Sequence, residues 1–271
     1  MIFKDKVVVI TGASSGIGKA LAHEFASKGA NLVLAARQYI TLCEIAQSLE
    51  KKFGIRAVAI ACDVSHEEDC KLMIAQAIQS FKRIDVLVNN AGISMRALFK
   101  DVDLKVLKQI MDINFWGTVY CTKYAMPELL KTKGSVVGVS SVAGYKGLPG
   151  RTGYSASKFA MNGFLDSLRI ENLKTGVHVL TACPGFTNSN IRNTALAKDG
   201  TQQGETHMDE GKLMSSEEVA RIIVDGVAAR KRTLIMTGQG KLTVLLSKFI
   251  PAKLDQLVYN VFAKEKDALL K

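Results

Sequence analysis

Seven short apolar runs, each followed by a longer amphipathic segment, restrict this chain to few architectures. The runs occupy residues 6–10, 31–36, 56–62, 85–89, 134–140, 177–183 and 233–237. Apolar runs of this length with helical patterns between them are typical of buried strands in a parallel sheet that helices cover on both faces. Ser-x-x-Glu sequences at 65–68 and 215–218 predict two helix N-termini as capping boxes. The sequence therefore predicts an α/β fold with a doubly wound, seven-stranded parallel sheet.

The alternation predicts one domain over residues 1–238 of this 271-residue chain, and two segments depart from it. Residues 185–214 are polar and contain glycines, which predicts either a functional loop on the substrate side or a disordered segment. Residues 239–271 form a C-terminal extension, in which apolar residues recur at near-helical spacing among lysines between 240 and 266. Such an amphipathic helix can lie on an anionic membrane, seal a substrate cleft or pack on a partner subunit.

Composition narrows the classes of partner and compartment. The net charge of +11 permits nucleic acid, an acidic membrane or a phosphorylated ligand, but the basic residues are scattered, so no nucleic-acid partner is expected. The five cysteines form no C-x-x-C pair and the four histidines lack ligand spacing, so we expect neither disulfides nor a metal. We find no signal peptide and no apolar run long enough to span a bilayer. These features predict a cytoplasmic protein, with membrane association through the extension as an alternative.

A glycine-rich turn, TGASSGIGKA at residues 11–20, directly follows the first apolar run. It would join a strand to a helix where free backbone N–H groups and the positive end of the helix attract phosphate. Glycines permit the tight turn and the close approach of a dinucleotide. The sequence therefore predicts a Rossmann-type nucleotide site formed by Gly12, Ser14, Ser15, Gly16, Ile17 and Gly18.

The end of the second run indicates which nucleotide binds. An acidic residue there would bind the adenosine ribose and favour NAD, but the sequence is LVLAARQ, with Ala36 at the tip and Arg37 next. A guanidinium can hold a 2′-phosphate through two N–H bonds. We therefore predict NADP(H) as the cofactor, with NADPH preferred over NADH. The alternative is that Arg37 is only the solvated start of the next helix.

A tyrosine and a lysine stand four positions apart in TGYSASKFAMNGF, residues 152–164. In a helix this spacing places Tyr154 and Lys158 on one face. A phenol has a pKa of about 10, and a nearby ammonium lowers it by stabilising the phenolate. The pair is thus a candidate acid and base at neutral pH.

The motifs occur in the order found in the short-chain dehydrogenase/reductase family. They are TGASSGIG at 11–18, NNAG at 89–92, Asn114 in MDINFWG, SS at 140–141, YSASK at 154–158 and PG at 184–185. The chain resembles this family from residue 5 to about residue 190. Its C-terminal extension resembles that of the NADP-preferring branch of 11β-hydroxysteroid dehydrogenases, which also includes dehydrogenase/reductase 7-like members.

This resemblance implies a role for each catalytic residue. Tyr154 would transfer the proton while hydride moves to or from the nicotinamide. Lys158 would lower the pKa of Tyr154 and hold the nicotinamide ribose. Ser141 would bind the substrate oxygen, and Asn114 would lie where a water links the lysine to solvent. The resemblance adds further cofactor contacts at Asp63, Val64, Asn90, Ala91, Gly92, Pro184, Gly185 and Thr187.

Three assignments have alternatives. Asp63 could simply begin a helix with Ser65, and Ser140 could be only a buried hydroxyl at a strand end. Ser189 is an alternative to Thr187 as the hydroxyl that helps to bind the cofactor carboxamide.

The substrate side is expected in the loops 93–99, 142–153 and 185–214. Apolar residues there would line a pocket, although each could instead belong to the core: Met95, Leu98, Phe99, Tyr145, Leu148 and Phe186, with Ser141 and Tyr154 at the reacting oxygen. This predicts oxidation or reduction between a carbonyl and a secondary alcohol on a hydrophobic, steroid-, retinoid- or lipid-like substrate, by a homodimer or homotetramer. The alternatives are 3-oxoacyl thioester reduction, an NADP(H)-binding redox sensor, and an interaction protein at a membrane surface.

Overall fold

The seven predicted strands form one parallel sheet. The computed structural model describes residues 2–188, 191, 194–204, 213–264 and 268–270. Its strands are β1 (Val7–Thr11), β2 (Asn31–Ala36), β3 (Ala57–Ala61), β4 (Val86–Asn89), β5 (Ser135–Val139), β6 (His178–Cys183) and β9 (Thr233–Ile235). The order across the sheet is β3-β2-β1-β4-β5-β6-β9, and every pairing is parallel. The doubly wound fold predicted from the apolar runs is confirmed.

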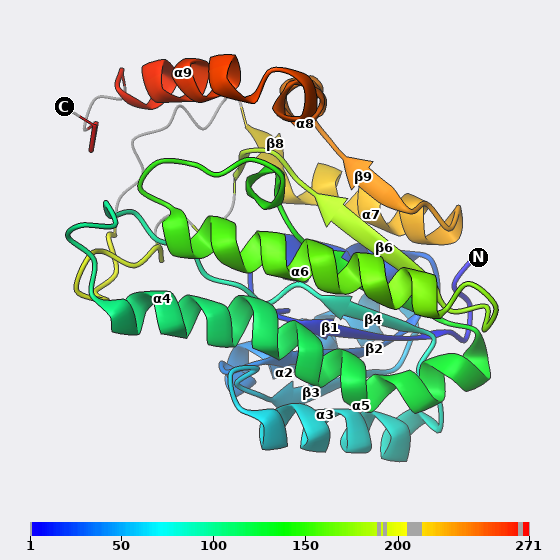
Figure 1. The fold of residues 1–271 in the computed structure, drawn as a ribbon. Coiled ribbons are helices and arrows are strands. Elements are labelled where there is room, and N and C mark those ends of the chain that lie inside the picture. The colour runs from blue at the N-terminus through cyan, green and yellow to red at the C-terminus, as the bar shows by residue number, and fades with distance from the viewer. Residues whose placement is uncertain (1, 189–190, 192–193, 205–212, 265–267, 271) are drawn as a thin grey trace.

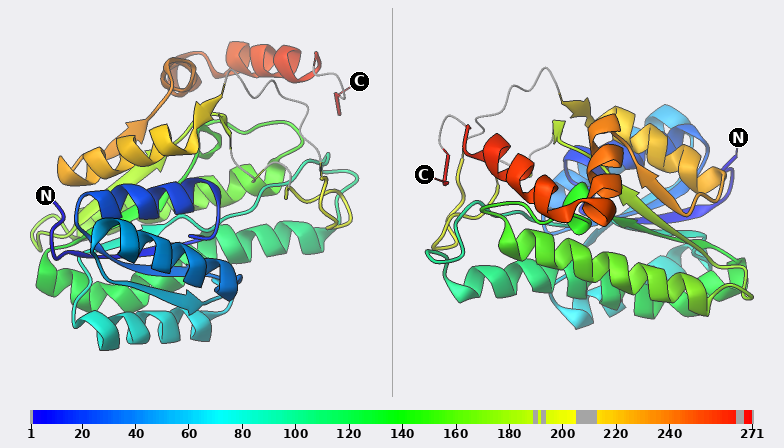
Figure 2. Two further views of the ribbon diagram at one scale, coloured as in Figure 1. Left: turned by 180° about the vertical axis from the view of Figure 1, so that it is seen from behind. Right: turned by 45° about the horizontal axis from the view of Figure 1, so that its top comes forward.

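Helices cover the sheet on both faces and divide its core in two (Figure 1). One core lies under α1 (Gly16–Ser27), α2 (Tyr39–Phe53) and α7 (Ser216–Ala228), which Figure 2 shows from behind. The other lies under α3 (Glu67–Phe81), α5 (Gly117–Thr132) and α6 (Thr152–Glu171). Successive side chains of a strand point to opposite faces, so the residues of β1 alternate between the two cores. Val8 and Ile10 pack in the first core, and Val7 and Val9 pack in the second.

The two predicted capping boxes have different outcomes. At 215–218 the Ser215 hydroxyl accepts the N–H of Glu218 at 3.0 Å and begins α7, as predicted. At 65–68 the first helical residue of α3 is Glu67, so His66 is the N-cap. The Ser65 hydroxyl instead donates to the Asp63 carboxylate at 2.7 Å. The Ser65 N–H also donates to this carboxylate, at 3.0 Å, so Ser65 belongs to a local turn that precedes the helix.

The predicted substrate loop contains short pieces of regular structure among its described residues. β7 (Thr187–Asn188) pairs with β8 (Met214–Ser215), and Leu196 forms single bridges with Met95 and Gln202. These pairings bind the loop to the segment that follows β4, at the edge of the sheet where the parallel strands end.

The C-terminal extension folds as two helices, α8 (Gly238–Phe249) and α9 (Pro251–Phe262), which lie together at the top of Figure 1. Pro251 occupies the first turn of α9, a position that needs no backbone N–H. The α9 side chains Leu254 and Asp255 attach the helix to the domain, the first by burial and the second by an ion pair with Lys146. Within the described part of the chain, none of the helices combines the length and apolarity that crossing a bilayer requires.

Candidate active site

The glycine-rich turn places backbone N–H groups at the start of α1. Gly12 and Gly16 have φ values of +64° and +49°, which side chains with a Cβ rarely adopt. A Cβ on Gly18 would lie 2.1 Å from the Gly12 carbonyl oxygen, so this position admits only glycine. Ser15 is the N-cap of α1, and its hydroxyl makes no cap hydrogen bond. Since the first N–H groups of a helix attract anions, the turn fits the diphosphate of a dinucleotide.

The NNAG segment supports this turn from the neighbouring strand. The Thr11 hydroxyl accepts the N–H groups of Asn90 and Ala91, each at 3.0 Å. The Asn90 amide donates to the carbonyl oxygens of Thr11 at 2.9 Å and Gly12 at 3.2 Å. Gly92 follows, and a Cβ there would lie 3.2 Å from Asn114 Oδ1 and 3.6 Å from Lys158 Nζ. Asn90 thus fixes the glycine-rich turn, while Gly92 lies against Asn114 and Lys158.

Arg37 is exposed directly after β2, and Ala36 at the strand end contributes no carboxylate. Asp63 follows β3, the neighbouring strand, and its carboxylate accepts the Ser65 N–H and hydroxyl. Burial opposes the ionisation of Asp63, but these hydrogen bonds and the Arg37 charge together lower its pKa. Val64 is buried against Gly117 of α5. The Asp63 carboxylate that the Arg37 charge influences is therefore already bonded to Ser65.

Tyr154 and Lys158 lie on one face of α6, as the spacing predicts. Lys158 is buried, and its ammonium donates to the Val139 carbonyl at 2.9 Å and lies 5.7 Å from the centre of the Tyr154 ring. Burial lowers the pKa of Lys158 to about 8.

The pKa of Tyr154 is raised, whereas the sequence predicts that it is lowered. Burial raises the pKa of the phenol, and this effect exceeds the opposing influence of the Ser141 hydroxyl and the Arg151 charge. The Lys158 ammonium donates to a backbone carbonyl and lies 5.7 Å from the centre of the phenol ring, so it does not offset the effect of burial on the Tyr154 pKa. Tyr154 is therefore protonated at neutral pH.

The two serines at 140 and 141 have different surroundings. The Ser141 hydroxyl accepts the Ala143 N–H at 3.1 Å, which begins a short 3-10 turn (Val142–Gly144), and it interacts with Tyr154. Ser140 is buried and donates to Asn162 Oδ1 at 2.6 Å. Ser141 is thus beside the phenol, while Ser140 joins β5 to α6.

Asn114 lies in a single π-helical turn (Asp112–Trp116) between α4 (Leu104–Met111) and α5. Its amide donates to the Ile93 carbonyl and the Ser157 hydroxyl, both at 2.9 Å, and its oxygen accepts the Ile93 N–H at 2.8 Å. Such turns often mark functional positions within helices. The turn places Asn114 next to Gly92, in the same region as the Lys158 ammonium.

The Pro-Gly segment leaves the end of β6 beneath α8. Pro184 is buried, and a Cβ on Gly185 would lie 2.6 Å from Thr237 Cγ2. Thr187 is buried and donates to the Gly185 carbonyl at 3.1 Å, so its hydroxyl is already engaged. The competing hydroxyl of Ser189 lies outside the described residues.

The predicted substrate residues separate into core and surface. Met95 is fully buried in an apolar cluster with Val106 and Ile110, so it belongs to the core of this region instead of the pocket wall. Burial raises the pKa of Tyr145 to about 12, and its hydroxyl interacts with Cys183 at the end of β6. Three of the predicted apolar residues face open space: Leu148 in a cavity of about 440 Å³ beside α9, and Phe99 and Phe186 at the surface.

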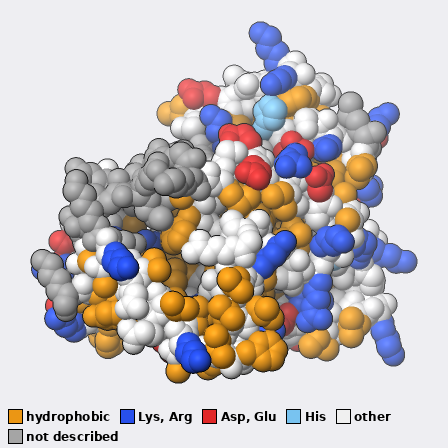
Figure 3. Space-filling view, turned by 90° about the horizontal axis from the view of Figure 1, so that it is seen from above, with side chains coloured by type: hydrophobic (Ala, Val, Ile, Leu, Met, Phe, Trp, Pro, Cys, Tyr) orange, Lys and Arg blue, Asp and Glu red, His pale blue; other side chains and the backbone are white. Residues whose placement is uncertain are grey.

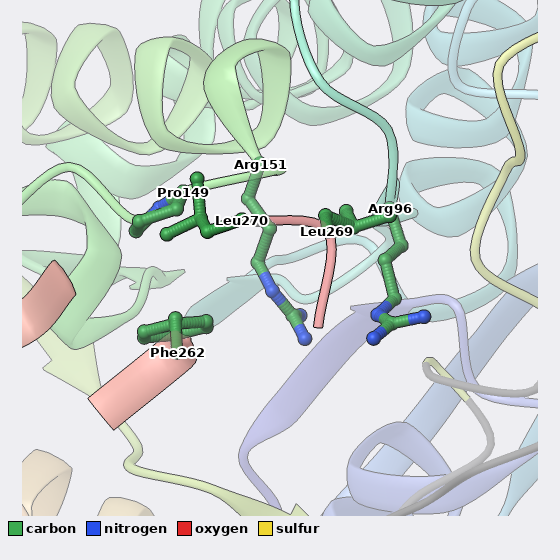
Figure 4. Close-up of a pocket in the computed structure, with 6 residues that line it drawn as sticks. All are labelled: Arg96, Pro149, Arg151, Phe262, Leu269 and Leu270. Carbon is green, nitrogen blue, oxygen red and sulfur yellow. The ribbon is translucent and has the colours of Figure 1, made fainter. Parts of the chain in front are cut away.

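Some contributing residues carried no recognised signal in the sequence. Thr11 precedes the glycine turn and holds two N–H groups of NNAG, although a hydroxyl at a strand end is common. Arg96 and Arg151 enter one pocket near Tyr154 from separate loops. They are far apart in the sequence, so the sequence did not indicate that they line one pocket (Figure 4). Arg151 precedes Tyr154 by only one helical turn.

Comparisons with known proteins agree with this site. A family model described as short chain dehydrogenase matches residues 6–200. The chain is 35% identical over 263 residues to 11-beta-hydroxysteroid dehydrogenase 1A of Arabidopsis thaliana, covering 91% of this chain and 72% of that protein. It is 36% identical over 261 residues to 11-beta-hydroxysteroid dehydrogenase-like 2 of the same plant, covering 95% and 82% respectively.

Among solved structures, the chain is similar to an alcohol dehydrogenase from the archaeon Thermococcus sibiricus, solved in complex with 5-hydroxy-NADP. The TM-score is 0.76 at 25% identity, covering 85% of this chain and 95% of that chain. Fold and site together define an oxidoreductase that uses a nicotinamide cofactor. The chain belongs to the short-chain dehydrogenase family, and the resemblance predicted from its motifs is confirmed.

Proposed function

We propose that this protein is an NADP(H)-dependent oxidoreductase that interconverts a carbonyl and a secondary alcohol on a hydrophobic substrate. The observation that supports the proposal is that Tyr154, Lys158 and Ser141 lie together at the carboxyl ends of the parallel strands, where the glycine-rich turn also lies. In open α/β sheets this edge is where ligands bind.

The side chains divide the proton chemistry among them. A bound nicotinamide nucleotide supplies or accepts the hydride. Tyr154 is protonated at neutral pH and can donate its proton to the oxygen of a carbonyl substrate, which Ser141 orients. Lys158 keeps most of its charge at neutral pH and can stabilise the phenolate that results, since an opposite charge favours the ionised form.

The preference for NADPH rests on Arg37. Its exposed side chain follows an alanine strand end, where it can bind a 2′-phosphate without competition from a carboxylate at position 36. The similar archaeal enzyme, solved with an NADP derivative, supports this choice. Substituting Arg37→Gln is expected to raise the KM for NADPH by about tenfold or more, as loss of a charged hydrogen bond does, and to leave that for NADH unchanged. Equal effects on both cofactors would contradict the assignment.

The substrate class rests on the apolar residues at the site and on the relatives. The 11-beta-hydroxysteroid dehydrogenases are named for a steroid, which supports a large apolar ketone or alcohol here. The test is NADPH oxidation against steroid ketones, retinal, quinones, aldehydes and 3-oxoacyl thioesters, with Tyr154→Phe alongside. Turnover of an apolar ketone that the variant loses would support the proposal. Turnover of thioesters alone would favour the acyl alternative, and NADPH binding without any turnover would favour the redox sensor.

The aromatic face over α5 and α6 supports a homodimer or homotetramer. Trp116 and Phe159 are 43% and 47% exposed, and Trp116 stacks on Tyr120 at 5.7 Å between ring centres. We propose that a second copy covers these rings, because exposed apolar side chains that cluster on a surface mark interfaces. Light scattering should give a dimer or tetramer for the native protein and a smaller species for Trp116→Lys. A monomeric native protein would contradict this.

We further propose a cytoplasmic protein whose C-terminal helices can contact an anionic membrane. Figure 3 looks onto the side that carries α8 and α9, where apolar and basic side chains are interspersed. Exposed apolar residues there include Leu242, Leu245, Phe249, Leu257 and Val261. Sedimentation with anionic vesicles should fall in a Leu245→Ser, Phe249→Ser variant. Equal sedimentation of the variant and the native protein would contradict the contact.

A further inference from the structure

Ser157 joins α6 to the π-helical turn that carries Asn114. Figure 1 shows α6 alongside α4 and α5, and the turn lies between those two helices in the chain. The Ser157 hydroxyl donates to the Tyr154 carbonyl at 2.7 Å and accepts the Asn114 amide at 2.9 Å. Ser157 and Asn114 are both fully buried. Because water cannot replace a buried partner, removing the hydroxyl leaves a polar group unsatisfied and is destabilising.

The directions of these two bonds determine how the Asn114 amide lies. A serine hydroxyl has one hydrogen to donate, and the Tyr154 carbonyl receives it. The Ser157 oxygen can then only accept from its other partner, so the N–H side of the Asn114 amide must face it. The amide oxygen is turned to the Ile93 N–H, which it accepts at 2.8 Å. Ser157 and Ile93 therefore select the same orientation of Asn114 independently.

This orientation affects the segment that follows β4. Asn114 binds Ile93 at both its N–H and its carbonyl, at 2.8 and 2.9 Å. Gly92 directly precedes Ile93. A Cβ on Gly92 would lie 3.2 Å from Asn114 Oδ1 and 3.6 Å from Lys158 Nζ. A displacement of the Asn114 amide would therefore move backbone that packs next to the Lys158 ammonium.

We propose that Ser157 is a positioning residue, which acts through Asn114 to hold Gly92 and Ile93 in place beside Lys158 during the reaction. This rests on the proposed function and goes beyond it by assigning a role to Ser157. A serine suits this position because its hydroxyl donates within its own helix and still accepts from a neighbouring one. Alanine can make neither bond, and cysteine, at a similar volume, makes only weak ones.

Hydrogen exchange of the Ile93 amide, measured by NMR, tests this link without relying on turnover. Ile93 donates its N–H to Asn114, so its exchange rate reports the position of Asn114. In the full-length protein, Ser157→Ala and Ser157→Cys should each speed this exchange about tenfold, because the net contribution of one hydrogen bond has this size. The amides of β1, within the sheet, measure any loss of global stability and correct for it.

Ser135→Ala is the matched control. Ser135 is a buried serine that begins β5, at the end of the strand remote from Ser141. Its hydroxyl bonds to His178 Nδ1 at 3.1 Å, so this variant also loses one buried hydrogen bond. After correction for stability, Ser135→Ala should leave the Ile93 exchange rate and kcat unchanged.

Kinetics on the ketone that the substrate panel identifies measure the consequence for the reaction. Ser157→Ala should lower kcat about tenfold and leave the KM for the ketone within about twofold of the native value, because the groups that it positions act in the transition state. A serine with a purely structural role would instead lower the free energy of unfolding in urea and leave kcat unchanged.

Three results would overturn the proposal. Corrected Ile93 exchange that is equal in Ser157→Ala and Ser135→Ala would show that Ser157 does not position Asn114. Native exchange in Ser157→Cys would show that the volume of the side chain matters and not its hydroxyl. Faster Ile93 exchange with a native kcat would show that this position does not affect the reaction. Faster exchange in a protein that reduces none of the panel substrates would support the link from Ser157 to Ile93 and refute only the proposed function.

Discussion

Replacing the buried Lys158 should stabilise the fold. Lys158 is 3% exposed, and burial lowers its pKa from 10.5 to about 8. This shift corresponds to about 3 kcal/mol by which burial of the ammonium destabilises the folded state at pH 7. Lys158→Met removes this charge and keeps the aliphatic volume, but leaves the Val139 carbonyl without its donor, which costs about 1 kcal/mol or more. The net expectation is a variant about 1–2 kcal/mol more stable at pH 7 and inactive.

The pH dependence of stability separates the effect of the Lys158 charge from the effect of losing its hydrogen bond to Val139. The unfolded chain binds the Lys158 proton more tightly than the folded protein does, so native stability rises with pH between about pH 8 and pH 10.5. The variant lacks this contribution. From pH 7 to about pH 9.5 the native protein should therefore gain about 2 kcal/mol relative to Lys158→Met.

Urea denaturation without cofactor, followed by Trp116 fluorescence at both pH values, measures these differences. Lys174→Met, at an exposed position, is the control and should change stability little at either pH. A stability difference between the native protein and Lys158→Met that does not change with pH would refute the reasoning.

Three further predictions concern the turn, the serines and the pH profile. Gly18→Ala should lose NADPH binding in calorimetry and destabilise the protein by about 1–3 kcal/mol, because the new Cβ would overlap the Gly12 carbonyl; unchanged binding would contradict the assigned turn. Ser140→Ala should lower the free energy of unfolding by about 1 kcal/mol through loss of the bond to Asn162, whereas Ser141→Ala should lower kcat with little effect on stability; the reverse pattern would exchange their roles. The kcat/KM for carbonyl reduction should be highest below about pH 8 and fall above it, as Lys158 loses its proton. Initial rates measured on both sides of pH 8 test this, and a kcat/KM that rises with pH would exclude a role for the charged Lys158.

The strand pattern could be predicted because burial on both faces of a parallel sheet leaves a continuous apolar run in the sequence. The structure reproduces every predicted strand, although the run at 233–237 ends as a strand at Ile235. The capping prediction at Ser65 was wrong because α3 begins at Glu67 and Ser65 instead belongs to a turn in which its N–H and hydroxyl both donate to Asp63, which the S-x-x-E pattern does not include.

The site could be predicted where its chemistry depends on local spacing. Gly12, Gly16 and Gly18 lie in one turn, and Tyr154 and Lys158 on one helix, so sequence distance and spatial distance agree. The direction of the Tyr154 pKa could not be predicted, since it depends on burial and on Lys158 pointing at Val139.

Residues brought together by the loops gave no such signal. Met95 reads as a pocket residue in its loop, yet the bridge to Leu196 buries it. Arg96 and Arg151 line one pocket because the N–H of Ala97 bonds to the Gly150 carbonyl, a contact across more than fifty residues that only the fold creates.

Transfer of deuterium tests the central claim most directly. NADPH carrying deuterium in both positions of the reactive carbon of its nicotinamide is incubated with the protein and the ketone that the substrate panel identifies, and the alcohol is analysed by mass spectrometry. The account predicts one deuterium on the new carbinol carbon, at a rate that Tyr154→Phe reduces by about a hundredfold or more. An alcohol without deuterium, or an equal rate in the variant, would contradict hydride transfer with Tyr154 as the proton donor.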